Sequence, residues 1–156
     1  MIQVLFVCLG NICRSPMAEA VFRDLVRREG LQNKIFVDSA GTGSWHVGEP
    51  PHRGTLKILK SKGISANGMT ARQIVPEDGE RFHYILAMDR QNLRDLKKIV
   101  QAKEGVCIQL FLDLVDDVAF QDVPDPYFTG NFDEVYELII RGCHALLERI
   151  KAEHRL

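Results

Sequence analysis

The chain has 156 residues, which is enough for one domain of ordinary size with a proper core. A formal net charge of −1 and an isoelectric point near 6.5 argue against the strongly basic surface of a nucleic-acid-binding protein. No apolar run approaches the ~20 residues that span a bilayer, and the N-terminus lacks a signal-type segment, so we expect a soluble, cytoplasmic, single-domain protein (residues 1–156) without nucleic-acid or membrane partners.

Strand and helix patterns alternate along the first half of the chain. Residues 2–7 form a continuous apolar run, which predicts a buried strand. Residues 16–29 carry apolar side chains at helical spacing, and Gly30 ends this predicted helix. A second strand is predicted over residues 34–39 and a second helix over residues 54–62, before Gly63.

The alternation continues in the second half. Residues 84–88 predict a third strand that is buried on both faces, and Asp89 can cap a helix that runs to about residue 100. Residues 106–110 predict a fourth strand, and a long amphipathic helix follows a cap around Asn131. This order predicts an α/β fold, a parallel four-stranded sheet with helices on both faces, in which ligands bind at the carboxyl ends of the strands.

A tight polar loop follows the first predicted strand, from Cys8 to Pro16. Five residues separate Cys8 from Arg14, so a loop wrapped into a half-circle can place the Cys8 sulfur beneath a phosphate while Arg14 binds two of its oxygens. Backbone N–H groups and the positive end of the next helix would complete a phosphate-binding loop. The same field favours a thiolate, which makes Cys8 a candidate nucleophile, although an isolated cysteine is more often a small buried hydrophobe.

The composition of this loop supports the catalytic interpretation. Gly10 and Asn11 most readily adopt the positive φ angles that a backbone cradle needs. Ser15 can cap the following helix or donate its hydroxyl to the thiolate, and Pro16 suits the first helical turn.

Aromatic residues elsewhere can form the walls of a cleft around this loop. Trp45 lies among glycines, which favours a half-exposed wall, although a lone tryptophan often fills a small separate core. Tyr127 and Phe128 are further candidates, and Leu9 and Ile12 can complete an apolar lining. Such walls select flat aryl phosphates by stacking and exclude phosphoserine, which is too short to reach the phosphate site.

The four cysteines show no zinc-type spacing, and a reactive thiolate suits a reducing compartment. Cys13 can form a disulfide with Cys8 if their Cβ atoms approach to about 4 Å, or it can simply pack beneath the loop. Cys107 and Cys143 are predicted to be core residues of a strand and a helix. The five histidines show no metal-ligand spacing, so we expect no metal and no cofactor.

The run from Val7 to Pro16 resembles the active-site loop of the low-molecular-weight protein tyrosine phosphatases, Val-Cys-x-Gly-Asn-Ile-Cys-Arg-Ser-Pro. The resemblance continues, in the expected order, through residues 38–42, 45–48, 71–73, 84–89, 92–96 and 125–127. It implies hydrolysis of phosphotyrosine through a phosphocysteine on Cys8, with Arg14 binding the phosphate. Tyrosine-phosphorylated proteins would be the partners, and phosphate or other oxyanions would inhibit. The implied substrate-binding residues are Leu9, Gly10, Asn11, Ile12, Cys13, Ser15, Trp45 and Tyr127.

Asp125 lies between two prolines that stiffen the chain. From the local sequence alone, a turn-forming role is the better interpretation. The resemblance implies instead that Asp125 is the general acid and base, because the general acid of the family falls in this Asp-Pro motif. Other acidic residues nearby are then expected to be solvated surface charges: Asp116, Asp117 and Asp122.

Other details depend on the same resemblance. Within the family the adjacent loop cysteines form a disulfide, which implies a protective redox role for Cys13. Met69 occupies a position where many members have a histidine that holds the loop asparagine, and His52 replaces a frequent aspartate beside Arg53. Members that act on phosphoarginine have threonine at the position of Ile12, so Ile12 favours an aryl ring.

Two other functions use the same loop. An arsenate reductase would need two further cysteines that pass a disulfide to the surface, and Cys107 and Cys143 are far apart in the sequence and lie in regular elements. A non-catalytic phosphate-binding module would need neither Cys8 as an intact nucleophile nor Asp125 as an acid. We therefore expect a metal-free phosphotyrosine phosphatase.

Overall fold

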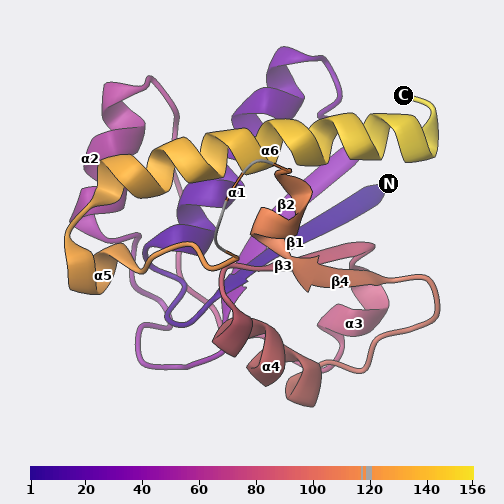
Figure 1. Cartoon of the computed structure of the whole chain (residues 1–156), viewed down its shortest axis with the longest axis horizontal. Coiled ribbons are helices and arrows are strands. Elements are labelled where there is room, and N and C mark those ends of the chain that lie inside the picture. The colour runs from indigo at the N-terminus through magenta and orange to yellow at the C-terminus, as the bar shows by residue number, and fades with distance from the viewer. Residues whose placement is uncertain (117, 119–120) are drawn as a thin grey trace.

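A parallel β-sheet forms the centre of the molecule (Figure 1). The computed structural model describes residues 1–116, 118 and 121–156, and within these the sheet has four strands in the order β2-β1-β3-β4. The strands are β1 (Ile2–Cys8), β2 (Ile35–Gly41), β3 (Tyr84–Ala87) and β4 (Cys107–Leu110). All neighbouring strands pair in parallel, which confirms the predicted sheet.

Helices cover both faces of this sheet, as the sequence predicted (Figure 1). One face carries α1 (Arg14–Arg28), α2 (Arg53–Ser61) and α6 (Phe132–His154), which pack against one another. The opposite face carries α3 (Asp78–Arg81) and α4 (Arg90–Ile99). The 3-10 helix η1 (Phe111–Leu114) and the short α5 (Pro126–Thr129) lie between β4 and α6 in the chain.

The strand β1 is buried on both faces, which explains its continuous apolar sequence. Val4, Phe6 and Cys8 belong to the core shared with α1 and α6. Leu5 and Val7 belong to the core on the α4 side. Because β1 has β2 on one side and β3 on the other, its carboxyl end lies where the strand order reverses, and ligands bind at this point in open α/β sheets. Cys8 is the residue at that end.

The ring of Phe111 packs between the sheet and the longest helix. It lies edge-on to Phe6 of β1, with the ring centroids 5.8 Å apart, and it is fully buried. Gly142 in the middle of α6 leaves space for this ring, because a Cβ there would lie 2.2 Å from Phe111 Cζ. The glycine lowers helix propensity locally but permits close packing beneath β1.

Every predicted boundary agrees with the structure to within two residues, and the long helix after Asn131, for which no end was predicted, runs to His154. The largest differences are that α1 begins at Arg14 rather than Pro16 and that β2 continues to Gly41 rather than Ser39. The predicted caps are confirmed: Asp89 accepts a backbone N–H at 2.7 Å and Asn131 accepts one at 3.1 Å. The sequence did not predict α3, α5 or η1, because four residues are too few to show a helical period.

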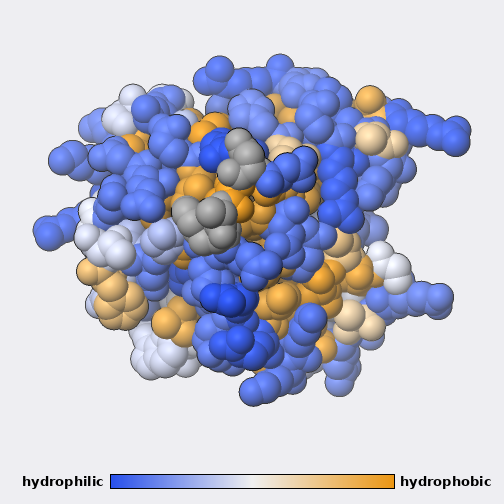
Figure 2. All heavy atoms as spheres, viewed as in Figure 1, coloured by the Kyte–Doolittle hydropathy of each residue, from blue (hydrophilic) through white to orange (hydrophobic). Residues whose placement is uncertain are grey.

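Most of the face seen in Figure 2 is hydrophilic. Over α5 the surface is pale to orange, and this helix carries the exposed side chains of Tyr127 and Phe128. Of the helices described, none combines the length and the apolar character that crossing a membrane requires. The exposed aromatic residues on α5 lie next to the site described below.

Candidate active site

The loop that joins β1 to α1 turns its carbonyl groups outward. The carbonyl oxygens of Cys8 and Leu9 accept hydrogen bonds of 3.0 and 2.9 Å from the segment after β2, and that of Ile12 accepts one of 2.7 Å from His52 N. The N–H of a peptide unit points opposite to its carbonyl, so the N–H groups turn to the inside of the loop. None of the N–H groups of residues 9–14 has a partner within the described part of the chain. Such a concave row of free donors binds anions.

Arg14 lies against this loop and is almost fully buried, with 2% of its surface exposed. Its Nη1 donates to Asp89 Oδ2 at 2.8 Å and to the carbonyl oxygen of Val123 at 2.9 Å, and Nη2 lies 3.4 Å from Asp125 Oδ2. Burial acts to lower the pKa of Arg14, but the negative charges of Cys8, Asp89 and Asp125 outweigh it and raise this pKa. Nε is buried and has no partner among the described residues. The cation can therefore still bind an oxyanion.

Asn11 holds the loop from inside. It adopts the left-handed conformation with φ of 57°, which asparagine tolerates better than most residues. Its Nδ2 donates to Ser15 Oγ at 2.8 Å and to Ser39 Oγ at 2.9 Å, while its Oδ1 accepts from Arg72 N at 2.9 Å. The buried amide thus uses both its donor and its acceptor, and the loop shape depends on it.

Ser15 connects Asn11 to the sulfur of Cys8. The Ser15 Oγ lies 2.9 Å from Cys8 Sγ, and both residues are buried. Because Asn11 donates to the Ser15 oxygen, the single hydroxyl hydrogen of Ser15 is available to a Cys8 thiolate. Of the two roles predicted for Ser15, its position fits hydrogen bonding to the Cys8 sulfur and not capping of α1. The N-cap of α1 is Cys13, and it makes no side-chain capping bond.

A buried carboxylate supports Asn11 from behind. Ser39 donates to Glu19 Oε1 at 2.6 Å, and Arg23 pairs with the other oxygen of Glu19. Burial raises the pKa of Glu19, although Ser39 and Arg23 act in the opposite direction. The side chain of Met69, where many members of the resembling family have a histidine, packs against the apolar core and makes no hydrogen bond to Asn11. Serine hydroxyls and one backbone N–H therefore hold Asn11 in this chain.

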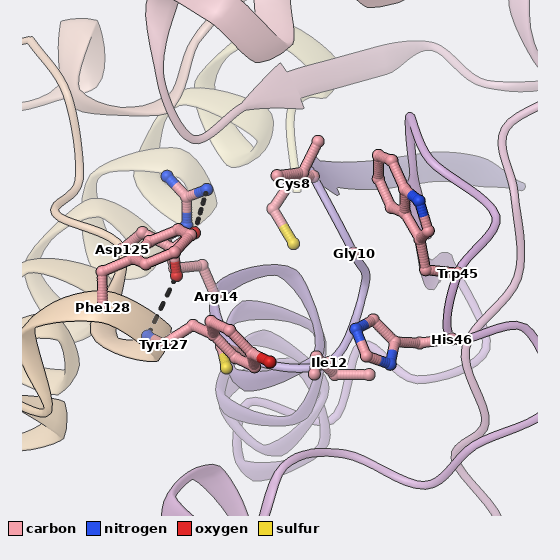
Figure 3. Close-up of a pocket in the computed structure, with 11 residues that line it drawn as sticks. Cys8, Gly10, Ile12, Arg14, Trp45, His46, Asp125, Tyr127 and Phe128 are labelled. Atoms are coloured by element: carbon pink, nitrogen blue, oxygen red, sulfur yellow. Dashed lines mark hydrogen bonds and ion pairs between the residues drawn. The ribbon is translucent and has the colours of Figure 1, made fainter.

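Asp125 serves as the N-cap of α5 and also faces the loop (Figure 3). One carboxylate oxygen accepts from Tyr127 N at 3.1 Å, and the other lies 3.4 Å from Arg14 Nη2. The side chain is 23% exposed, and Pro126 begins the helix directly after it. Asp125 thus both caps the turn at the start of α5 and lines the same cavity as Cys8.

A cavity of about 120 Å³ opens above Cys8 (Figure 3). Trp45 lies on one side of the Cys8 sulfur, and Tyr127 and Phe128 lie on the other. Trp45 is 69% exposed and Tyr127 is 55% exposed, so neither ring fills a core. The lining residues are Cys8, Leu9, Gly10, Ile12, Cys13, Arg14, Trp45, His46, Asp125, Tyr127 and Phe128. The structure thus brings the predicted wall residues together with the loop.

His46 also lines this cavity, and sequence reasoning assigned it no role. Its ring centroid lies 6.4 Å from that of Tyr127, and its Nδ1 lies 2.9 Å from Glu49 Oε2. Gly10 does not adopt the predicted positive φ. A glycine still fits there, because a Cβ would lie 3.1 Å from His46 Cδ2. The signal that could have identified His46 is its position directly after Trp45 in the chain.

The four cysteines are all free thiols with different surroundings. Burial, followed by the negative charges of Asp125 and Cys8, raises the pKa of Cys13 to about 12, so it is a thiol at neutral pH. Cys143 is fully buried in α6, as predicted. The predicted core position of Cys107 is wrong: it is half-buried at the start of the edge strand β4, where Arg149 Nη2 lies 3.6 Å from its sulfur.

Other predicted surface and loop residues have mixed outcomes. Asp122 is not merely solvated, because it accepts hydrogen bonds from the backbone N–H of Arg90, at 2.9 Å, and from the Arg90 side chain. Slight burial acts to raise the pKa of Asp122, but these hydrogen bonds outweigh it and lower the pKa. Asp116 is exposed, as expected, and Asp117 lies outside the described residues. The His52 ring caps α2 by accepting a backbone N–H at 3.0 Å. Within residues 1–116, 118 and 121–156, no group of three or more potential ligand side chains is arranged to hold a metal.

Asp89 has two roles, and the sequence predicted only one of them. It was predicted as a helix cap, and its Oδ1 does cap α4, but its Oδ2 binds the guanidinium of Arg14. The carbonyl of Val123 and the hydroxyl of Ser39 were also missed. These contacts join residues that are distant in the chain, and no local pattern indicates them.

Comparisons with known proteins agree with this geometry. The family described as low molecular weight phosphotyrosine protein phosphatase matches residues 3–156. The chain is 55% identical over 156 residues to the low molecular weight protein-tyrosine-phosphatase YfkJ of Bacillus subtilis, and the match covers 100% of both chains. The crystal structure of YfkJ has a TM-score of 0.94 at 56% identity, covering 98% of this chain and 96% of that one.

A further solved relative carries a different substrate in its name. The crystal structure of DARP, a Drosophila arginine phosphatase, has a TM-score of 0.88 at 37% identity and covers 96% of this chain and 98% of that one. The family match nevertheless extends over nearly the whole chain. The chain therefore belongs to the low-molecular-weight phosphotyrosine protein phosphatase family, a family of hydrolases.

Proposed function

We propose that this protein hydrolyses phosphotyrosine in proteins, and aryl phosphates, through a phosphocysteine intermediate. One observation carries the proposal: Cys8 and Arg14 line one cavity, and the N–H groups of residues 9–14 in the loop that joins them have no partner among the described residues. Fixed donors of this kind stabilise the negative charge on the equatorial oxygens of a transferring phosphoryl group.

In the first step the Cys8 thiolate attacks phosphorus. The S–P bond forms as the bond from phosphorus to the tyrosyl oxygen breaks, and the protonated carboxyl of Asp125 gives its proton to that oxygen. Arg14 and the loop N–H groups hold the three remaining oxygens. The Ser15 hydroxyl, 2.9 Å from Cys8 Sγ, stabilises the thiolate before attack.

In the second step water hydrolyses the phosphocysteine. Asp125, now a carboxylate, takes a proton from the water as the water oxygen bonds to phosphorus, and the S–P bond breaks to release phosphate and the Cys8 thiolate. Asp125 Oδ2 lies 3.4 Å from Arg14 Nη2, and Asp125 lines the cavity, so the carboxyl group is beside the phosphate site for both steps. No metal ion has a part in this scheme.

The walls of the cavity favour phosphotyrosine as the substrate class. Cys8 is only 3% exposed, so its sulfur lies below the rims that Trp45 and Tyr127 form. A phosphotyrosine ring can fill the space between these rims while its phosphate reaches the loop, whereas the shorter phosphoserine cannot. The partners are therefore tyrosine-phosphorylated proteins. Free phosphate and other oxyanions compete for the same donors and act as inhibitors.

An arsenate reductase on this scaffold is less well supported. Cys107 begins β4 and Cys8 ends β1, so in a parallel sheet the two thiols lie at opposite ends. Cys143 is fully buried in α6 and cannot carry a disulfide to the surface. Neither thiol is therefore placed to relay oxidation from the loop.

Cys13 gives the enzyme a protective redox response. Peroxide oxidises Cys8 to a sulfenic acid, and the Cys13 sulfur then displaces water to form a Cys8–Cys13 disulfide, which an external thiol reduces. Because the thiolate is the attacking species, the raised pKa of Cys13 makes this closure slow at neutral pH. We propose that the chain acts as one domain in the reducing cytoplasm, where both thiols are regenerated.

Replacement of Cys8 tests the nucleophile. We expect Cys8→Ser to abolish hydrolysis of p-nitrophenyl phosphate while phosphate binding is retained, because a serine hydroxyl is a weak nucleophile and the N–H cradle is unchanged. Turnover would be measured with and without EDTA, and phosphate binding by calorimetry, with Cys107→Ser as the matched control. Turnover by Cys8→Ser, or loss of parental turnover on chelation, would contradict the mechanism.

Replacement of Asp125 tests the general acid. We expect Asp125→Asn to lower kcat for phosphotyrosine by roughly 10²- to 10⁴-fold, and by less for p-nitrophenyl phosphate, whose leaving group needs less protonation. Asp122→Asn is the matched control, since Asp122 lies three residues before Asp125 but pairs with Arg90 and does not line the cavity. Equal losses for the two substrates, or an equal loss in the control, would assign the acid elsewhere.

A single substitution tests the preference against phosphoarginine. Ile12 presents an apolar surface in the cavity, so we expect the parent to prefer phosphotyrosine. Ile12→Thr should narrow the gap in kcat/KM between matched phosphotyrosine and phosphoarginine peptides. Ile12→Val introduces a side chain that is isosteric with threonine but lacks the hydroxyl, and it should leave the gap unchanged. A parent that prefers phosphoarginine would overturn the substrate assignment and leave the Cys8 chemistry intact.

The redox response predicts a distinct pH dependence. After equal peroxide exposure, we expect thiol to restore the parent but not Cys13→Ser. The rate of disulfide closure should rise from pH 6 to pH 8 by roughly tenfold per unit, since burial raises the pKa of Cys13 and the thiolate fraction grows in that proportion well below the pKa. Peptide mapping of quenched samples gives the rate. Full recovery of Cys13→Ser would show that Cys13 does not protect Cys8.

A further inference from the structure

A second hollow, of about 290 Å³, adjoins the catalytic cavity. We name it the side pocket; it is lined by Leu9, Thr42, Trp45, Asp95, Lys98 and Ile99, together with the backbone of Gly43. Leu9 and Trp45 line both the side pocket and the catalytic cavity. The two hollows are therefore neighbours, and α4 supplies the outer wall of the second one through three of its residues.

Trp45 forms a firm partition between the two hollows although it is 69% exposed. Its ring lies directly against Gly43, where an added Cβ would come within 1.8 Å of Trp45 Cζ3. Any larger residue at position 43 would push the ring away. A chain that is bound with its phosphotyrosine beside Trp45 and continues over the indole consequently meets the side pocket, because Trp45 lines both hollows.

The lining of the side pocket indicates what it can bind. Leu9, Trp45 and Ile99 offer apolar surface. At the rim, Asp95 accepts from Gln91 at 2.9 Å, while Lys98 has no ion-pair partner in the described part of the chain. These two charges are opposite in sign, so the rim carries no net charge that would select an acidic or a basic side chain.

One polar atom in the lining is unsatisfied. Thr42 Oγ1 is buried and has no hydrogen-bond partner among the described residues. Because this oxygen is buried, a bound peptide does not reach it, and the side pocket offers its occupant mainly the apolar surface of Leu9, Trp45 and Ile99. The backbone of Thr42 also donates to the Cys8 carbonyl at 3.0 Å, so this residue belongs to the support of the catalytic loop as well as to the side pocket.

We propose that the side pocket is a specificity subsite for the phosphoprotein substrate, and that it takes an aliphatic side chain two residues from the phosphotyrosine. In an extended peptide, side chains of residues i and i+2 point the same way and lie roughly 7 Å apart. A phosphotyrosine directed to Cys8 therefore directs its second neighbour to the same surface of the enzyme. The inference rests on the proposed phosphotyrosine hydrolysis and adds a sequence preference to it.

The test compares phosphotyrosine peptides that have alanine at every flanking position except one. Leucine would be placed in turn at −2, −1, +1 and +2, and kcat/KM measured for each peptide. We expect leucine at −2 or at +2 to raise kcat/KM by roughly 3- to 10-fold over alanine, in keeping with partial burial of one aliphatic side chain. Leucine at −1 and +1 should have no comparable effect.

Variants connect that preference to the side pocket. Ile99→Ala should abolish the leucine preference without changing kcat/KM for p-nitrophenyl phosphate, which occupies the catalytic cavity alone. Leu93→Ala is the matched control, because Leu93 packs against the same core from α4 without lining the side pocket. Ile99→Phe, which fills the side pocket instead of enlarging it, should also abolish the leucine preference and leave p-nitrophenyl phosphate unaffected. It keeps the test decisive should Ile99→Ala fail to fold.

The outcomes separate this subsite from the proposed function. Hydrolysis of all the peptides at one rate, or a leucine preference that survives in Ile99→Ala, would overturn the subsite and leave phosphotyrosine hydrolysis standing. A preference for peptides with glutamate in place of leucine, if it disappears in Lys98→Glu, would show that the side pocket binds an acidic side chain. That result would also overturn the proposal. A parent that hydrolyses p-nitrophenyl phosphate but no phosphotyrosine peptide would overturn the proposed function, and the subsite with it.

Discussion

The active-site loop can bind an anion only if its N–H groups have no partners within the protein, and the rest of the structure is arranged to meet this constraint. Backbone N–H groups that lack partners are rare in folded proteins, so a row of them must be held in place by other bonds. Here the outward carbonyls are bonded by the segment after β2 and by His52, while Asn11 bonds the loop from inside. Strand order places β1 where both supports are within reach.

Arg14 is the point at which distant parts of the chain converge. Three acceptors from two other segments meet its guanidinium: Asp89 after β3, the Val123 carbonyl, and Asp125 at the start of α5. Burying a cation is costly unless charged or polar partners surround it, and these acceptors offset that cost before any phosphate is bound. Because Asp125 is one of the partners, a group that holds Arg14 also lines the cavity, where the proposed mechanism requires a proton donor.

The orientation of Asn11 depends on three separate segments of the chain. Its amide is bonded by Ser15, Ser39 and the N–H of Arg72. Arg72 is itself fixed by two hydrogen bonds of 3.0 Å to Asp78. The position of the Arg72 N–H, and through it the amide orientation of Asn11, thus depends on a charged pair outside the cavity.

The sequence by itself determined the sheet, the helix caps and the identity of the loop, because each depends on neighbours in the chain. The continuous apolar run of β1, the cap at Asn131 and the spacing from Cys8 to Arg14 are local properties, and the family resemblance added Asp125. Only the tertiary structure decided which groups surround the loop. The bonds from Arg14 to Asp89 and to Val123 join residues 75 and 109 positions apart, and no periodic pattern records such contacts. The same holds for His46, for the Glu19–Ser39 support and for the side pocket, where separate elements meet only after the chain has folded.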